Sequence, residues 1–592
     1  MSLRVLLLAV SSASVLLGAV PALAQGAAPT TATSASEQEG LKLKALYDAY
    51  WGARMRDYGR ESDGKGGFAE ARRLPAIDVA SQERRAGVAE GLLNDLKSVR
   101  IDQLSPEDQI NASVFQTVLE HALIEFRARE WEAPINSDSN FWTYLDGRGT
   151  FTTREAYQAY LARLADIPRY FQDQTANMKL GLARGFTPPR VTIEGRDVSI
   201  SSFITPTAET NAFYRQFERM PSTIPVAEQA ALRAEAKRVI EAEVIPAYRA
   251  LLDFYNSEYL PGARTSLAAY DLPNGRDFYA EQIVKYTTLN LTADQIHQTG
   301  LSEVARIKAE MQSIMDEVGF KGSLPEFTQA LRSDPQFIAK TPDELLMTSA
   351  WVAKRAEGQL ARLFGKLPRL PYTIIPVPEA LAPFYTAGRG GLGSCQMNTY
   401  DLPSRPLYNI PALTLHECAP GHSFQAALAL EQAAVPDFRR STYFSGYGEG
   451  WGLYTEYLGV EMGIYRTPYE HFGRLSYEMW RAARLVIDTG VHSKGWSREQ
   501  ALAYLGDHTA MSHREVETEV DRYISWPAQA LSYKLGEMTI RRLRIEAEQA
   551  LGEQFDIKSF HDTILETGSV PLPTLEARIK AWTQERAARP DA

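Results

Sequence analysis

Two histidines and a glutamate near the middle of the chain have the residue types of a metal site. His416 is followed directly by Glu417, and a second histidine, His422, comes six residues after the first. In the common metalloprotease motif the histidines are four residues apart, so one helical turn presents both imidazoles on one face with a glutamate beside them. Six residues of regular helix turn the second side chain about 240° away from the first. A single straight helix therefore cannot direct both histidines at one metal ion.

Pro420 and Gly421 lie between the two histidines and permit a departure from the regular helix. Proline removes a backbone donor from a helix interior, and glycine tolerates unusual backbone conformations. A π-bulge or a broken turn here would direct His422 back to the metal side. The alternative is a helix that ends at Ala419, with His422 serving as a cap or hydrogen-bonded in the core. The spacing alone leaves both possibilities open.

Two downstream glutamates offer the remaining parts of such a site. A catalytic zinc bound by two histidines needs a third protein ligand, commonly a carboxylate, and an open fourth position. Glu449 follows two glycines and is expected near the start of a new helix, with Glu456 seven residues later on the same face. Glu449 suits the third ligand, and Glu456 suits a hydrogen-bonding partner for a ligand histidine. Each could instead be a solvated carboxylate.

Several motifs, in the same order along the chain, resemble the bacterial "domain of unknown function 885" family, which is grouped with gluzincin metallopeptidases. The resemblance extends from about residue 45 to 580 and is dense after residue 395. The segments that carry it are 416–422, 449–456 (Glu-Gly-Trp-Gly-Leu-Tyr-Thr-Glu), 478–492, 519–523 and 526–536.

The resemblance implies a helical metallopeptidase fold with a deep cleft. It also implies that His416, His422 and Glu449 bind the metal and that Glu417 is the general base. Two imidazoles and a carboxylate suit zinc best among the divalent metals, so we expect one Zn²⁺ per chain. These assignments remain predictions from sequence.

Other residues in the matched segments could contact a peptide substrate. Tyr533 and His492 are the predicted donors to the oxyanion, with a buried structural role as the alternative for each. Arg481 could bind a substrate carboxylate, although pairing with a nearby acid is an alternative. The glycine-rich residues 388–394 lack the ending of a phosphate-binding loop and are expected to form a flexible rim. After that rim, Asn398 and Tyr400 could line a strand edge that holds the substrate backbone, with a plain loop as the alternative.

The hydrophobic periodicity predicts a mainly α fold with a small strand region. Apolar residues recur at helical spacing over 225–259 (with an interruption near Pro246), 293–318, 475–489, 529–550 and 559–566. Thr292 is a suitable N-cap for the second of these helices. Strand-like runs are short and cover only 190–193, 199–203 and 372–377. We expect an N-terminal helical lobe over 40–280 and a catalytic helical lobe over 281–592, or one unit if the weak boundary near residues 272–275 is only a loop.

The N-terminus has the pattern of a secretory signal peptide over residues 1–24. Arg4 precedes an apolar run, and cleavage is expected near Ala24/Gln25, followed by a flexible linker over 25–39. The alternative is an uncleaved membrane anchor. Gln25 is not a cysteine, so no lipid attachment is expected at the cut. We predict a periplasmic or secreted protein without stable membrane insertion.

The composition is that of an ordinary globular protein, with 44% hydrophobic and 23% charged residues. A net charge of −10 argues against nucleic acid as a partner, because phosphate binding needs a basic face. Cys395 and Cys418 are the only cysteines, and a buried free thiol at Cys418 is the prediction, with a disulfide as the alternative. The leading hypothesis is an exported zinc metallopeptidase acting on short peptides. The alternatives are a non-catalytic peptide-binding protein and a zinc hydrolase of a non-peptide amide or ester.

Overall fold

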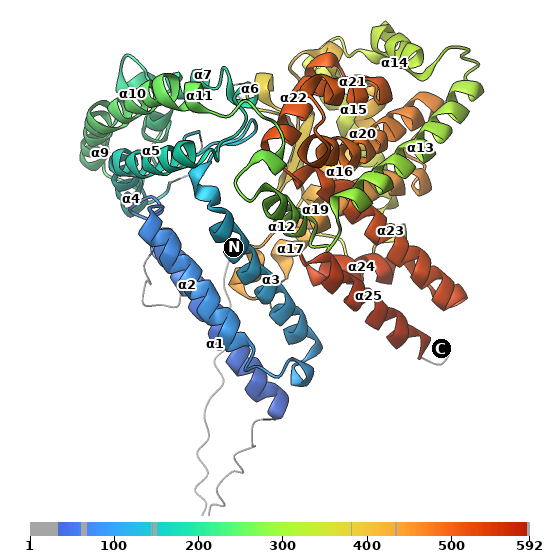
Figure 1. The fold of residues 1–592 in the computed structure, drawn as a ribbon, viewed down its shortest axis with the longest axis horizontal. Coiled ribbons are helices and arrows are strands. Elements are labelled where there is room, and N and C mark those ends of the chain that lie inside the picture. The colour runs from blue at the N-terminus through green and yellow to red at the C-terminus, as the bar shows by residue number, and fades with distance from the viewer. Residues whose placement is uncertain are drawn as a thin grey trace, which may run out of the picture.

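The computed structural model describes residues 34–60, 68–143, 145, 151–379, 382–432 and 435–588 of the 592-residue chain. The expected signal peptide and most of the expected linker lie outside these residues. Helix α1 begins at Ala35, within the stretch expected to be a linker, and Ser34 caps it by accepting a hydrogen bond from the Glu37 amide. The described part of the chain is mainly α-helical with one small sheet, which confirms the predicted fold class (Figure 1).

Three long N-terminal helices run side by side at the lower left of Figure 1 and belong to the same core as the C-terminal helices. They are α1 (Ala35–Asp57), α2 (Val79–Leu96) and α3 (Pro106–Ala128). Their apolar faces contact residues far along the chain. The ring of Phe438, for example, lies 5.1 Å from that of Tyr47 and 5.4 Å from that of Phe115. A second apolar core, built from residues 74–263, belongs to the helices at the upper left.

The helices at the upper left are mostly short. They are α4 (Arg154–Ala165), α5 (Ile167–Arg184), α6 (Arg190–Ile193), α7 (Asp197–Ser201), α8 (Arg215–Glu218), α9 (Val226–Val239), α10 (Ile245–Phe254) and α11 (Leu260–Gly262). The predicted helix over 225–259 is present, and two π-helical turns at Ile240–Val244 and Tyr255–Tyr259 interrupt it. The first turn ends just before Pro246, where a wider turn relieves the clash of proline with the preceding carbonyls.

The strands predicted at 190–193 and 199–203 were wrong. Residues 190–193 form helix α6, and residues 199–203 begin in helix α7 and continue past its end. Their hydroxyl side chains bond to carbonyls three residues earlier, as a helical turn permits and a strand does not. Thr192 Oγ1 donates to Pro189 O and Ser199 Oγ donates to Arg196 O. Short β-branched runs are ambiguous between the two structures, and tertiary burial decides between them.

The remaining helices surround the sequence motifs. They are α12 (Gly275–Thr287), α13 (Ala293–Glu317), α14 (Leu324–Ser333), α15 (Pro342–Leu363), α16 (Ile410–Glu417), α17 (His422–Glu431), α18 (Asp437–Arg440), α19 (Ser445–Glu461), α20 (Pro468–Lys494), α21 (Arg498–His508), α22 (His513–Ser525), α23 (Ser532–Leu551), α24 (Ile557–Thr567) and α25 (Leu572–Ala587). The predicted helices over 293–318, 475–489, 529–550 and 559–566 correspond to α13, part of α20, α23 and α24. Thr292 forms a capping box with Gln295, as the N-cap prediction requires.

The sheet has three short strands, β1 (Thr373–Pro376), β2 (Gly388–Gly391) and β3 (Ser394–Met397), in the order β1-β3-β2. β1 is parallel to β3 and was predicted. β2 and β3 form an antiparallel hairpin in which Gly390 is opposite Cys395. The glycine-rich run expected to be a flexible rim is therefore largely an edge strand and its turn.

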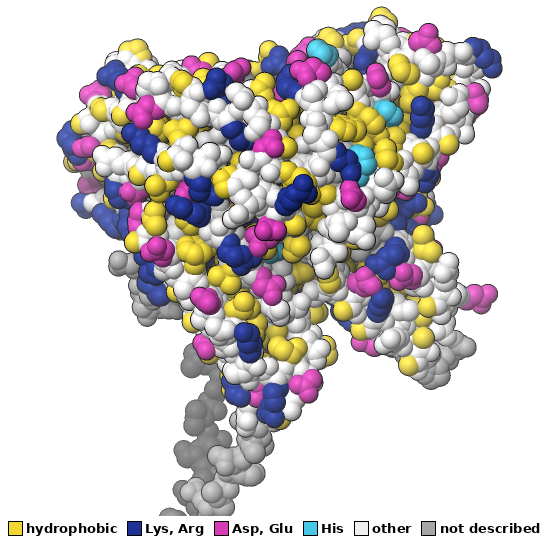
Figure 2. Space-filling model, viewed as in Figure 1, with side chains coloured by type: hydrophobic (Ala, Val, Ile, Leu, Met, Phe, Trp, Pro, Cys, Tyr) yellow, Lys and Arg dark blue, Asp and Glu magenta, His cyan; other side chains and the backbone are white. Residues whose placement is uncertain are grey.

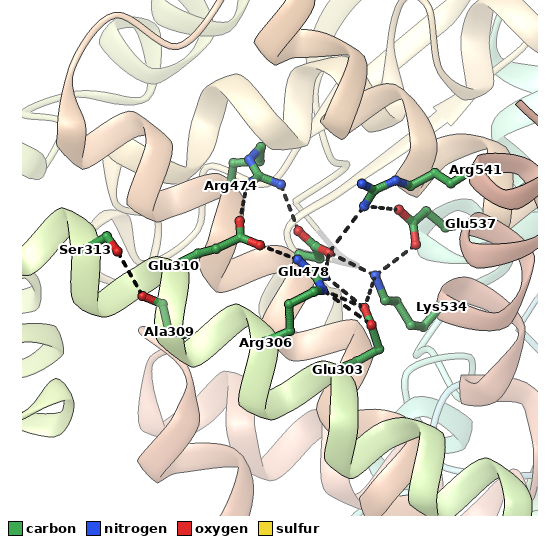
Figure 3. A network of polar contacts seen from close by, with 10 residues as sticks. All are labelled: Glu303, Arg306, Ala309, Glu310, Ser313, Arg474, Glu478, Lys534, Glu537 and Arg541. Carbon is green, nitrogen blue, oxygen red and sulfur yellow. Dashed lines mark hydrogen bonds and ion pairs between the residues drawn. The ribbon is translucent and has the colours of Figure 1, made fainter. Parts of the chain in front are cut away.

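A buried charge network joins α13, α20 and α23 (Figure 3). Lys534 is fully buried, and its Nζ lies 2.9 Å from Glu478 Oε1, 2.8 Å from Glu537 Oε2 and 3.0 Å from Glu303 Oε2. Arg306 and Arg474 also pair with Glu478. Burial raises the pKa of Glu478, but these cations outweigh it and hold the pKa well below its usual range. The network fixes α20 and α23, which carry Arg481 and Tyr533, relative to each other.

On the face shown in Figure 2, acidic and basic side chains are interspersed over all the visible elements. Neither sign of charge dominates this face. None of the described helices combines the length and apolar character needed to cross a bilayer.

Candidate metal centre

A break between two helices brings the histidines of the motif together. Helix α16 ends at Glu417 and α17 begins at His422, and the Ala419–Pro420 peptide bond between them is cis. The two imidazole rings are 4.8 Å apart and nearly perpendicular. The structure therefore has the broken turn, one of the two arrangements that the spacing left open.

Glu449 completes a cluster with the two histidines. Its Oε2 lies 3.3 Å from His422 Nε2 and 3.7 Å from His416 Nε2, and the three potential ligand atoms all lie within 4.8 Å of one another. Ligand atoms around a tetrahedral zinc with bonds of about 2.0–2.1 Å are separated by roughly 3.3–3.5 Å. The donor set and its spacing therefore fit a zinc ion. Among the described residues, this is the one group of three or more such side chains that could hold a metal.

Glu456 supports His416 from the side away from the cluster. Its Oε1 accepts a hydrogen bond from His416 Nδ1 at 2.8 Å, and both side chains are buried. Burial lowers the pKa of His416, but Glu449 and Glu456 outweigh it and raise the pKa to about 9. A carboxylate on Nδ1 fixes the ring orientation and leaves Nε2 directed at the cluster. Glu456 thus occupies the position that its seven-residue spacing from Glu449 suggests.

Glu417 points to the edge strand of the sheet. Its Oε2 accepts a hydrogen bond from the Gly390 amide at 2.5 Å. Strand β2 can approach this closely only because residue 390 is glycine. A Cβ there would lie 2.0 Å from the Glu417 carbonyl oxygen and 2.6 Å from His422 Cβ. Sequence reasoning missed this contact, although the glycine-rich composition of residues 388–394 was a signal for it.

A disulfide between Cys395 and Cys418 ties strand β3 to the end of α16, with the two Cα atoms 5.3 Å apart. The predicted free thiol at Cys418 was therefore wrong. The residues are 23 positions apart in the sequence, and Cys395 lies beside the break because its partner in the hairpin, Gly390, contacts Glu417. The disulfide holds the β2–β3 hairpin against Glu417.

Two tyrosines lie at the cluster. Tyr443 Oη donates to Glu449 Oε1 at 3.2 Å, a contact that the sequence did not indicate. The ring of Tyr533 is nearly parallel to that of His416, with centroids 6.4 Å apart. Tyr533 Oη accepts a hydrogen bond from Arg522 Nη2 at 3.3 Å, so its own proton is available to a ligand.

A cavity of about 960 Å³ contains the cluster. Its lining includes His416, Glu417, His422, Glu449, Tyr443, Tyr533, the β2 strand, and three arginines, Arg481, Arg484 and Arg522. Asp138 and Ser139 from the N-terminal half line it as well. The cavity therefore combines segments more than 350 residues apart, and its volume accommodates a short peptide.

The structure does not place His492, Asn398 or Tyr400 in this lining. His492 is fully buried: its Nδ1 accepts from the Ala269 amide and its Nε2 donates to the Tyr523 carbonyl. Burial lowers its pKa to about 3. Asn398 is buried and its amide donates to three carbonyls of the preceding loop, whereas Tyr400 is exposed and its ring faces Arg514. These contacts tie loops and helices together away from the cluster.

The fold and the site define a mainly α-helical protein with a two-histidine, one-glutamate cluster in a large cavity. The profile of the family described as "Bacterial protein of unknown function (DUF885)" matches residues 60–579, and the chain belongs to this family. A crystal structure of a "putative lipoprotein" from Colwellia psychrerythraea is 26% identical, with a TM-score of 0.85, and the match covers 94% of this chain and all of the other. A "putative lipoprotein of unknown function" from Shewanella oneidensis shares the fold at 19% identity and a TM-score of 0.68, over 92% of this chain and 99% of the other. A search of curated proteins found no match.

Proposed function

We propose that this protein is a zinc-dependent peptidase of the gluzincin type, acting on short peptides in the cavity. The observation that carries the proposal is the spacing of His416 Nε2, His422 Nε2 and Glu449 Oε2, with the Glu417 carboxylate next to one ligand. Buried charged groups are costly unless they are paired or bind a cation. A divalent ion would compensate the carboxylates that gather at this point.

The chain would supply the proton transfers of the reaction. When bound, zinc acts as a Lewis acid on the scissile carbonyl and lowers the pKa of water. Glu417 would take a proton from the attacking water and deliver it to the leaving amine. The C–N bond of the amide breaks, the hydroxyl of water joins the acyl carbon, and its hydrogen joins the amine. Tyr533 would donate its hydroxyl proton to the developing oxyanion, because its oxygen already accepts from Arg522.

The contact between Glu417 and the Gly390 amide supports the role of Glu417 as a base. A hydrogen bond from backbone fixes one carboxylate oxygen and leaves the other free for the proton. The disulfide and the close packing at Gly390 keep this geometry rigid. Rigid placement matters because small errors in the position of a catalytic group cost large factors in rate.

We further propose that the protein is exported. The signal-peptide pattern of residues 1–24 supports this, and so does a disulfide, because disulfides persist in oxidising compartments. Two proteins of the same fold carry the name lipoprotein. Gln25 takes the place where a lipid-bearing cysteine would be expected at the cut.

The first test is the zinc content per chain, measured by mass spectrometry on protein purified without added metal. We expect about one zinc in the wild type and in the Glu417→Gln variant, and little in His422→Ala. His471→Ala is the matched control, because this histidine is on α20 and outside the cavity lining. Zinc retained by His422→Ala would show that the proposed ligand set is wrong.

The second test is cleavage of a peptide library by the same variants. We expect Glu417→Gln to keep its zinc and to lose about 10²- to 10⁴-fold in rate, as for loss of a general base. Zinc-loaded wild type that binds peptides without cleaving them would favour a peptide-binding protein. Cleavage of only non-peptide amides or esters would assign a different hydrolase.

A further inference from the structure

Five arginines line the cavity, and three of them, termed the arginine wall, belong to helices α20 and α22. Arg481 and Arg484 project from α20, and Arg522 projects from α22. Glu519 is the acid closest to two of them: its Oε2 lies 2.7 Å from Arg484 Nη2, and its Oε1 lies 3.6 Å from Arg522 Nη1. Glu519 is therefore shared between Arg484 and Arg522, and Arg481 is not paired with it.

Two other acids are near this wall, and Glu456 Oε1 lies 3.9 Å from Arg481 Nη2. Glu456 already accepts a hydrogen bond from His416. Asp138 lines the same cavity and acts on Arg522, but its side chain is exposed and therefore screened by solvent.

Arg481 has no hydrogen-bond acceptor among the residues that the structure describes. Its side chain is only 4% exposed, and its Nε and Nη1 atoms are buried without a partner. Its Nη2 lies 3.9 Å from Glu456 Oε1, beyond hydrogen-bond distance. A guanidinium carries five donor hydrogens, and leaving them unsatisfied in a buried place is costly. An acceptor from outside the chain would remove this cost.

Aromatic rings hold the Arg481 guanidinium in place. Its Cζ atom lies 3.6 Å from the centroid of the Trp480 ring, 5.1 Å from that of Tyr477 and 5.6 Å from that of Tyr533. Arg484 differs, because Glu519 and the Tyr523 hydroxyl already accept its hydrogen bonds. Arg481 is therefore oriented by packing, while its Nε and Nη1 donors have no acceptor among the described residues.

We infer that Arg481, with Arg522 and the Tyr533 hydroxyl beside it, forms a subsite for a carboxylate of the substrate. The planar guanidinium can bind a carboxylate through two parallel hydrogen bonds. This inference rests on the proposed peptidase function and specifies its substrate class: peptides whose free C-terminal carboxylate, or an acidic side chain, occupies the arginine wall.

The position of the subsite restricts where a peptide would be cut. Glu456 Oε1 lies 2.8 Å from His416 Nδ1 and 3.9 Å from Arg481 Nη2, so the guanidinium is close behind a proposed ligand. A peptide residue spans about 3.3–3.6 Å. A C-terminal carboxylate bound at Arg481 would therefore place the cleaved bond near the C-terminal end of the peptide.

Binding and cleavage are measured on the same probes. The probes are randomised N-acetyl tetrapeptides prepared as free acids, as C-terminal amides, and as amides ending in glutamate. Equilibrium dialysis against zinc-loaded Glu417→Gln protein gives binding without turnover, and mass spectrometry of wild-type digests identifies the products. Arg481→Met and Arg481→Lys are compared with Arg466→Met, which removes a charge outside the cavity lining.

We expect free acids to bind about 10- to 100-fold more tightly than amides, with the preference lost in Arg481→Met and reduced in Arg481→Lys. Arg466→Met should behave as the parent does. If amides ending in glutamate bind as well as free acids, the subsite takes an acidic side chain instead. Equal binding of acids and plain amides, or a preference unchanged in both Arg481 variants, overturns the inference. Absence of cleavage in the presence of this preference would count against the peptidase proposal alone.

Discussion

Replacement of Glu456 tests whether its hydrogen bond to His416 strengthens metal binding at the cluster. Glu456 is 1% exposed, and its Oε1 is 2.8 Å from His416 Nδ1. We expect Glu456→Leu to weaken zinc binding and Glu456→Gln to weaken it less, because the amide oxygen can still accept from Nδ1. Glu461→Gln, at a partly exposed ion pair on the same helix, is the matched control.

The expected loss of zinc affinity follows from the hydrogen bond that the substitution removes. A hydrogen bond to a charged group contributes about 1.5–3 kcal/mol, and 1.4 kcal/mol corresponds to a tenfold change in affinity. The dissociation constant for zinc should therefore rise by about 10- to 100-fold in Glu456→Leu, in the range usual for groups that orient metal ligands. For Glu456→Gln, the rise in the dissociation constant for zinc should lie near the lower end of this range.

Protons compete with zinc for His416, so the measured zinc affinity should depend on pH. Glu449 and Glu456 raise the pKa of His416 to about 9 against the effect of burial, so below this pH a proton must leave before zinc binds. Wild-type affinity should rise about tenfold per pH unit up to about pH 9 and then level off. Removal of Glu456 lowers this pKa, so the difference between wild type and Glu456→Leu should be largest at pH 9 and smaller at pH 7.

The assay is competition between the protein and a chromogenic chelator over this pH range, with thermal melting of the metal-free proteins to verify folding. Equal zinc affinity of Glu456→Leu and wild type at pH 9, in a folded variant, would refute the reasoning. Loss of affinity in the Glu461→Gln control would show that the effect is not local to His416.

Three further predictions concern stability and geometry. Lys534→Met leaves the buried acids of its network without their shared cation and should lower the free energy of unfolding by about 3–5 kcal/mol in chemical denaturation, whereas Lys580→Met at the surface should change it by less than about 1 kcal/mol. Burial, opposed by hydrogen bonds from Tyr279 and the Ala528 amide, raises the pKa of Asp488 from 3.8 to about 7, so the folded state keeps a proton that the unfolded chain releases. Wild-type stability should therefore fall relative to Asp488→Asn by up to roughly 4 kcal/mol as the pH rises from about 4 to 7, and an unchanged difference between the two proteins over this range would contradict the assignment. Gly390→Ala should move strand β2 away from Glu417 and reduce peptide cleavage by the zinc-loaded protein about 100-fold; full activity in this variant would show that the contact does not position Glu417.

The sequence predicted the long helices well because their signals are local. The Thr292 capping box begins α13 where expected, and the apolar period of residues 225–259 matches a helix whose interruption precedes Pro246. The short runs at 190–193 and 199–203 were misassigned, because runs of four or five residues rich in β-branched and hydroxyl side chains fit a strand or a helical turn equally well. Their burial against distant residues selected the helical turn.

The sequence by itself determined which residues could form the cluster: two histidines on either side of Pro420 and Gly421, and two glutamates seven residues apart on one helix. It did not determine the direction of the break, the Cys395–Cys418 disulfide or the contact between Gly390 and Glu417. Each of these depends on how a hairpin packs against the end of α16. Only the tertiary structure placed Arg481 among aromatic rings and left its guanidinium without a hydrogen-bond acceptor from the described part of the chain. The physical reason is that helix periodicity acts over a few residues, whereas desolvation and ion pairing depend on side chains that folding brings together from distant parts of the chain.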